Sequence, residues 1–233
     1  MEQVPAYVAI VFIITTIMAV YLFFRASGNN YKLLMTILAW SAATAITAAL
    51  GLFADFNSIP PPFLFVMAPP LGTMVLLMIT PAGKKFLDSF DLRMLTILQS
   101  VRILIEVGLF LLFIHKAVPE LMTFEGRNFD ILTGLSAPII YYAVFVKKTA
   151  GHRLLLTWNI IGLCLALFIV GNAMLAAPSP FQQFAFDQPN RAVFFFPYVW
   201  LPTIIVPICI IGHIGSIRQM MIIQRKVLPI EVQ

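Results

Sequence analysis

The chain has 233 residues, of which 61% are hydrophobic and 11% are charged, and its formal net charge is +5. Soluble domains carry about 25% charged residues, so the composition excludes an ordinary soluble globular protein. The positive charge does not predict a nucleic-acid partner, because the basic residues are scattered over short segments between apolar runs. We expect one polytopic membrane domain in contact with the lipid bilayer.

Seven apolar runs come close to the ~20 residues that an α-helix needs to cross a bilayer. They predict an all-α bundle of seven transmembrane helices over residues 4–24, 33–54, 63–80, 93–115, 131–146, 154–177 and 194–217. We expect these helices to form a single domain over residues 1–217. A short basic cytoplasmic tail is expected over residues 218–233.

The third predicted helix is interrupted in its middle by Pro69 and Pro70. Two consecutive prolines remove two backbone donors and clash with the preceding turn. We expect a kink or local unwinding there. The segment should face the bundle interior, because freed carbonyls in a membrane need protein or water partners.

The fourth predicted helix carries Arg102 and Glu106, two opposite charges inside an apolar run. A charge near the centre of a spanning helix costs roughly 2.5 to 3.5 kcal/mol on insertion scales. At four residues' spacing the two side chains share a helix face and can neutralise each other, with Gln99 on the same face. The pair is either a structural clamp or a solute- or ion-binding centre, in which Arg102 faces an anion or balances charge and Glu106 titrates.

The fifth and sixth predicted helices contain polar and aromatic side chains that could line a cavity with this pair. They are Tyr141, Tyr142, Asn159 and Asn172. Each could instead be an interhelical hydrogen-bonding group or an anchor at the membrane interface. The seventh predicted helix carries Pro197, Pro202 and Pro207, and we expect it to be bent.

The most polar loops are residues 119–130 and 178–193. Their charged residues expected on one outer surface are Glu125, Arg127, Asp130, Asp187 and Arg191. Opposite charges could tie the two loops together. Exposed ion pairs contribute only about 0 to 1 kcal/mol each, so phenylalanines such as Phe124 and Phe184 should add to the contact. The same loops could contact a periplasmic or membrane protein partner.

The basic residues are distributed unevenly between the two sides of the predicted bundle. Most of the 15 lysines and arginines lie after the first, third and fifth helices or in the tail. The positive-inside rule therefore predicts an N-terminus outside and a C-terminus in the cytoplasm.

The sequence contains no motif for catalysis or metal binding. His115, His152 and His213 are expected at different depths, and no HxxxH, HExxH or CxxC spacing occurs. Cys164 and Cys209 lie in predicted spans, where small apolar packing is their usual role. We expect no metal, no cofactor, no catalytic residue and no enzymatic activity.

Four stretches resemble segments of a group of small bacterial seven-helix membrane proteins with no assigned function. They are residues 102–106, 120–130, 177–190 and 196–202. The resemblance covers most of the fourth to seventh helices. It implies a multi-pass protein of the bacterial cytoplasmic (inner) membrane and nothing about a substrate.

Two functions are compatible with these features. We predict a protein that binds or transports a small solute or ion through a midplane polar site around Arg102 and Glu106. The alternative is a non-catalytic receptor or accessory subunit that uses loops 119–130 and 178–193 to contact a partner. Buried charge and a broken helix favour the first function, whereas aromatic-rich loops on one face favour the second.

Overall fold

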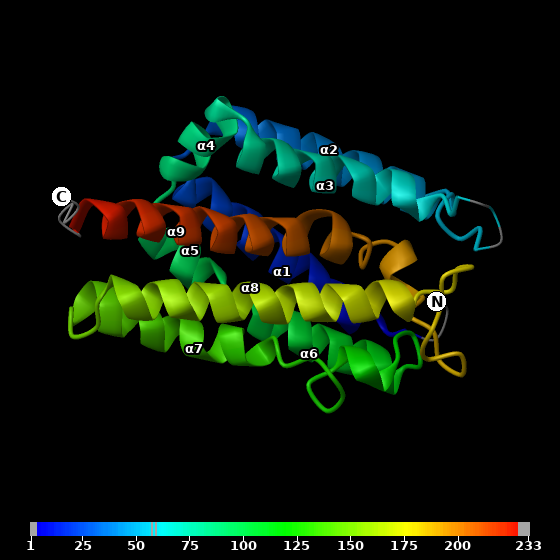
Figure 1. The fold of residues 1–233 in the computed structure, drawn as a ribbon. Coiled ribbons are helices and arrows are strands. Elements are labelled where there is room, and N and C mark those ends of the chain that lie inside the picture. Colours follow the sequence, from blue (N-terminus) through cyan, green and yellow to red (C-terminus); the bar gives the residue numbers. More distant parts are fainter. Residues whose placement is uncertain (1–3, 57, 59, 228–233) are drawn as a thin grey trace.

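The structure is a computed structural model that describes residues 4–56, 58 and 60–227, with the backbone alone for residues 225–227. These residues are mainly helical and contain no strand. The long helices run side by side, with the start of α1 and the end of α9 at opposite ends of the bundle (Figure 1). The predicted all-α class is confirmed.

The helical elements comprise nine α-helices and four short 3-10 or π-helical turns within the described residues. In chain order they are α1 (Ala6–Ala26), α2 (Tyr31–Ala49), α3 (Phe63–Ile79), α4 (Pro81–Asp88), α5 (Leu92–Leu98), α6 (Val101–Ile114), η1 (Glu120–Met122), α7 (Ile131–Tyr141), η2 (Tyr142–Val146), α8 (His152–Leu175), η3 (Ala192–Phe194), η4 (Leu201–Ile205) and α9 (Val206–Val227). Of these, η1 and η3 are 3-10 turns, while η2 and η4 are π-helical turns. Side-chain caps fix several starts: Asn30 accepts from the backbone of Leu33, and Asp91 from that of Arg93.

Five of the described helices are long and apolar enough to cross a membrane. They are α1, α2, α8 and the segments Leu92–Ile114 and Leu201–Gln224. The bent pair of α3 and α4 makes a sixth if it counts as one span, and Ile131–Val146 is a shorter apolar helix. Large apolar side chains such as Ile17, Phe65 and Ile139 remain exposed on the helix surfaces. The chain is therefore a multi-pass membrane protein with its outer surface suited to lipid.

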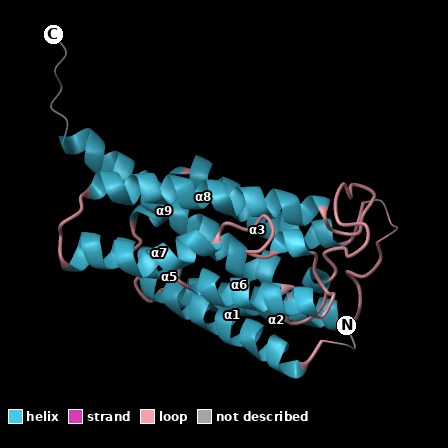
Figure 2. Ribbon diagram, turned by 90° about the horizontal axis from the view of Figure 1, so that it is seen from below, coloured by secondary structure: helices cyan, strands magenta, loops and turns pink. Residues whose placement is uncertain are grey.

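Helix α9 lies in the middle of the bundle. Helices α2 and α3 run along one side of it and α8 along the other, with α7 beyond α8 (Figure 1). Most loop residues gather at the end of the bundle where α1 begins (Figure 2). The tightly packed interior includes Phe12, Leu98 and Ile205, each almost fully buried. Residues 115–130 and 176–200 therefore meet at one end of this interior.

The helix breaks differ from the expected ones. Helix α3 continues through Pro69 and Pro70, so the expected unwinding is wrong, and Pro69 itself is exposed although its neighbours Val66 and Met67 line the cavity. The chain bends by 90° between α3 and α4 instead. Thr80 is extended there and its hydroxyl accepts from the Gly83 backbone, while Pro81 fits the first turn of the new helix. The bend therefore lies where Thr80 caps the start of α4, and not at Pro69 and Pro70.

The last helix begins and ends later than predicted. It starts with η4 at Leu201, where a π-helical turn accommodates Pro202. Helix α9 then continues to Val227. Residues 218–227, expected as part of a tail, are helical, and residues 228–233 lie outside the described part of the chain.

Candidate functional site

The predicted fourth helix is divided into α5 and α6 at Gln99 and Ser100. Backbone donors at this point reach carbonyls only three residues earlier, with Gln99 N to Thr96 O at 3.2 Å and Arg102 N to Gln99 O at 3.2 Å. Such a tightened turn changes which side chains share a helix face. Gln99, Arg102 and Glu106 are all almost fully buried.

Arg102 forms its ion pair with Asp130 rather than with Glu106. Its Nη1 donates to Asp130 Oδ2, and its Nε donates to Gln99 Oε1 at 3.0 Å. Gln99 in turn donates through Nε2 to the Cys209 carbonyl at 3.2 Å. The guanidinium is thus held by groups from the end of α5 and from the residue preceding α7. This corrects the expected Arg102–Glu106 pair, and it also corrects the expected outer-surface position of Asp130, which is buried.

Glu106 is bonded by Asn128, a residue that the sequence did not single out. Asn128 Nδ2 donates to Glu106 Oε1 at 2.5 Å and to the Met122 carbonyl at 3.0 Å. The Asn128 Oδ1 accepts from the Asp130 backbone at 3.2 Å. Residues 122–130 therefore fold back into the bundle and carry Asn128 and Asp130 to the charges of α6. The sequence signal available for this loop was its polarity, and polarity predicts that a loop is exposed to water rather than folded into the bundle.

Two carboxylate oxygens of this cluster have no hydrogen-bond partner among the described residues. They are Glu106 Oε2 and Asp130 Oδ1, both buried. Burial raises the pKa of the Asp130 carboxyl, which lies just before α7, while the charge of Arg102 lowers it. Buried polar atoms are ordinarily hydrogen-bonded. Two unpaired acceptors in one cluster therefore indicate a place for a donor.

The cluster lines part of a cavity of about 260 Å³. Its polar lining residues are Arg102, Glu106, Asn128 and Asp130 from the cluster, together with Asn190 and Thr203. Most of the rest is apolar and comes from α3, α8, η4 and α9. Ligand sites in proteins are typically concave, mostly apolar and supplied with a few polar groups, with volumes of about 300 to 1,000 Å³. The cavity has this character, and its volume lies just below that range.

Asn159 belongs to a second buried cluster, away from the cavity lining. Its Oδ1 lies 2.8 Å from Nδ1 of His213, and the His213 ring meets the Trp158 ring edge-on at 5.8 Å between centroids. Trp158 donates to the Ser136 hydroxyl at 2.8 Å. Gly162 provides the space for the His213 ring, since a Cβ there would lie 2.6 Å from His213 Cε1. This cluster joins α7, α8 and α9.

The other predicted lining residues also lie elsewhere. Asn172 donates to the Phe168 carbonyl of its own helix at 2.8 Å. Tyr141 packs on Phe145, and the exposed Tyr142 has the Lys147 ammonium 5.4 Å from its ring centroid. The structure does not bring these three side chains into the cavity.

The two loops, residues 119–130 and 178–193, contact each other, and Arg127 and Phe184 from the expected set make the contact as a cation–ring pair rather than an ion pair. The Arg127 guanidinium lies 5.2 Å from the Phe184 ring centroid, and Gln188 Nε2 donates to the Val118 carbonyl at 2.5 Å. None of the ion pairs found among the described residues involves Glu125, Asp187 or Arg191. These three side chains are exposed.

The described part of the chain holds no group of three or more His, Cys, Asp or Glu residues arranged for a metal ion. Fold and site together define an all-α, multi-pass membrane protein with a charged cavity in its interior.

Residues 59–221 match the family model described as a domain of unknown function, DUF8737. This match covers more than half of the chain, so the chain belongs to that family. Comparison with curated proteins and with solved structures gives no match.

Proposed function

We propose that the protein binds a small solute or ion at the polar side chains of the cavity and moves it through the membrane, without catalysing a reaction. The observation that carries the proposal is the pair of unpartnered oxygens, Glu106 Oε2 and Asp130 Oδ1, at one cavity. A hydrogen-bond donor or a cation would satisfy both oxygens. An anion would not, because its negative charge is repelled by the carboxylate groups that carry these oxygens.

The charges of the cluster favour a cation over a neutral donor. Two carboxyl groups face one guanidinium, which leaves one negative charge when all three groups are ionised. A buried carboxylate without a counter-charge is unfavourable, so it either takes up a proton or binds a cation. Among the described residues, Glu106 accepts a hydrogen bond only from the neutral amide of Asn128. A cationic ligand would therefore supply the charge that the surroundings of Glu106 lack.

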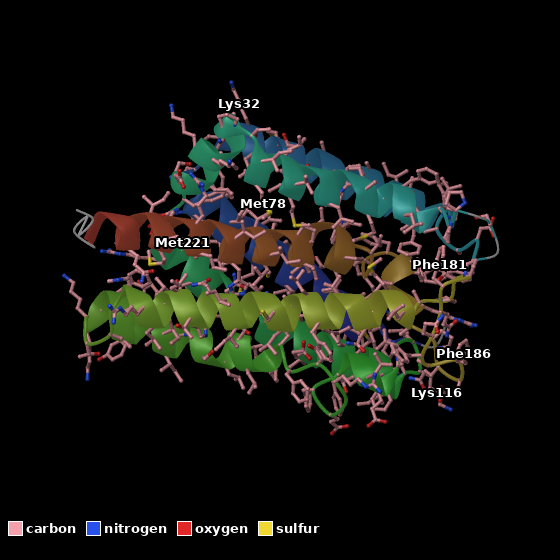
Figure 3. The ribbon with its side chains drawn as sticks, in the orientation of Figure 1. Lys32, Met78, Lys116, Phe181, Phe186 and Met221 are labelled. Carbon is pink, nitrogen blue, oxygen red and sulfur yellow. The ribbon has the colours of Figure 1, made fainter. Side chains whose placement is uncertain are left out.

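The proposal includes seven spans, an outer N-terminus, a cytoplasmic C-terminus and a bacterial inner membrane. The start of α1 and the end of α9 lie at opposite ends of the bundle, which supports an odd number of crossings (Figure 1). Lys32 lies at the end where α9 finishes, with other basic residues, whereas Lys116 lies at the opposite end (Figure 3). The positive-inside rule then assigns the first of these ends to the cytoplasm.

Single cysteines at Lys32 and Phe186 should report opposite sides of the membrane. Both side chains are exposed and lie at opposite ends of the bundle (Figure 3). In a background with Cys164 and Cys209 replaced by alanine, a membrane-impermeant maleimide added outside intact cells should label F186C and leave K32C unmodified until the cells are permeabilised. Labelling of K32C from outside would reverse the orientation.

Small cations should raise the melting temperature of the purified protein, and Glu106→Gln should abolish the rise. A ligand that binds only the folded state stabilises it increasingly as its concentration exceeds the dissociation constant. Ammonium, methylammonium and sodium, each added as the chloride, are the probes, and uptake of radiolabelled methylammonium into proteoliposomes reports movement.

The matched control is Glu125→Gln, which removes an exposed carboxylate from the outer loop. It should respond to the cations as the unmodified protein does. An equal response of Glu106→Gln, or no response of the unmodified protein, would remove the basis for a cation site.

A receptor or accessory role is the second candidate, and the exposed aromatic rings of the outer loop favour it. Phe181 and Phe186 are 59% and 71% exposed, at the end of the bundle away from Lys32 (Figure 3). Exposed apolar groups can mark a protein interaction surface. This role would be supported instead if the protein binds no cation and if replacing both phenylalanines with serine abolishes the binding of a protein partner.

A further inference from the structure

We infer that the ligand is a single-chain amphiphile with an alkylammonium head, and that it enters the cavity sideways from the bilayer between α3 and α8. This inference rests on the proposed function and specifies its ligand. It combines three features: where the cavity wall is exposed, what closes its outer end, and which polar groups line it.

Within the part of the chain that the structure describes, the exposed residues of the cavity wall lie on α3 and α8. Leu71 is 46% exposed, Met174 is 47% exposed, and Ala68 is also exposed. Both helices line the cavity, yet they do not pack closely against each other. All three residues lie within apolar helices, where the surrounding medium is lipid. The opening therefore faces hydrocarbon.

The outer end of the cavity is closed by aromatic side chains. Phe194 is almost fully buried and meets the rings of Phe56 and Phe63 edge-on, each at 5.1 Å between centroids. Asn190, also buried, donates to the Ala173 carbonyl at 3.3 Å and holds the loop against α8. A ligand from the outer aqueous phase would have to displace these packed rings, whereas one from the bilayer would not.

The cavity wall combines exposed apolar residues of α3 and α8 with the buried polar side chains of Arg102, Glu106, Asn128 and Asp130. A hydrocarbon chain between α3 and α8 would contact apolar walls, and its head would reach Glu106 and Asp130. A primary ammonium has three donors and one positive charge, which matches two free carboxylate oxygens and the excess negative charge. The volume of about 260 Å³ suits one chain rather than the two of a phospholipid.

The test uses a dodecylamine that carries a photoactivatable diazirine near the end of its chain. The full-length protein in mixed micelles is irradiated with it, and the modified peptides are identified by mass spectrometry. Saturable labelling should fall on α3 and α8, and unlabelled dodecylamine should displace it whereas dodecanoate should not. Glu106→Gln should weaken the apparent affinity about tenfold or more, as expected for loss of a charge-assisted hydrogen bond.

Leu71→Trp should block the opening and remove the saturable labelling. Val75→Trp is its control, because Val75 is 54% exposed on the same helix and does not line the cavity. Equal labelling of Leu71→Trp and the unmodified protein, or equal displacement by dodecanoate, would overturn the inference.

The two proposals fail in different ways. Methylammonium stabilisation without saturable labelling would refute the amphiphile and leave the small-cation site standing. Absence of both responses would refute both. Labelling that Leu71→Trp removes, in a variant still stabilised by methylammonium, would support both.

Discussion

Asp130→Asn is expected to destabilise the folded protein by about 3 to 5 kcal/mol, the range found when one partner of a buried ion pair is removed. The change leaves the guanidinium of Arg102 buried without its carboxylate. Arginine cannot relieve this by losing its proton. The free energy of unfolding, measured by titrating folded protein in mixed micelles with a denaturing detergent, is the appropriate readout.

Two further variants separate the charge effect from general damage. Arg102→Met combined with Asp130→Leu should recover most of the lost stability, because apolar groups of similar volume can replace a buried ion pair at little cost. Glu106→Gln should cost much less than Asp130→Asn, since a glutamine oxygen can still accept from Asn128. If Asp130→Asn unfolds at the same detergent fraction as the unmodified protein, the Arg102–Asp130 pair does not stabilise the bundle.

Gly162→Ala should lower stability by about 1 to 3 kcal/mol, the usual cost of overpacking a filled interior. The added Cβ would lie 2.6 Å from His213 Cε1 and 2.8 Å from its Nε2. The ring cannot easily turn aside, because Asn159 contacts its Nδ1 and Trp158 packs edge-on against it. The change should therefore separate α8 from α9.

Gly171→Ala supplies the control on the same helix. Nothing lies within 4 Å of a Cβ at Gly171, so the substitution should raise stability by up to about 1 kcal/mol through helix propensity alone. The two melting temperatures should therefore move in opposite directions. An increase in the melting temperature of both variants would show that the side chains around His213 move aside easily. The His213 cluster would then not set the distance between α8 and α9.

The positions of the helices were largely predictable from the sequence. The predicted spans 4–24 and 154–177 correspond to α1 (Ala6–Ala26) and α8 (His152–Leu175). A chain in lipid must satisfy its backbone hydrogen bonds internally, so long apolar runs become helices. The positions of the helix breaks were harder to predict. Helix α3 continues through a pair of prolines, whereas the break at Gln99 and Ser100 has no proline to indicate it.

The candidate site was predictable in part. The burial of Arg102 and Glu106 follows from the composition around them, but their partners do not. Helical spacing places Arg102 beside Glu106, yet its carboxylate comes from Asp130, whose position depends on the compact fold of the preceding loop. That fold requires Gly126, where a Cβ would lie 2.3 Å from the Glu120 carbonyl oxygen. Such a tertiary constraint leaves no periodic signal in the sequence.

The separation of Arg102 from Asp130 also bears on biogenesis. Asp130 follows Arg102 by 28 residues, so the ribosome synthesises the arginine well before its partner. A lone guanidinium at the centre of a bilayer is unfavourable. The Leu92–Ile114 segment should therefore pause at the membrane interface until the next loop emerges. The two segments would then enter the lipid as one hairpin, and truncation before Asp130 should leave the nascent chain incompletely inserted.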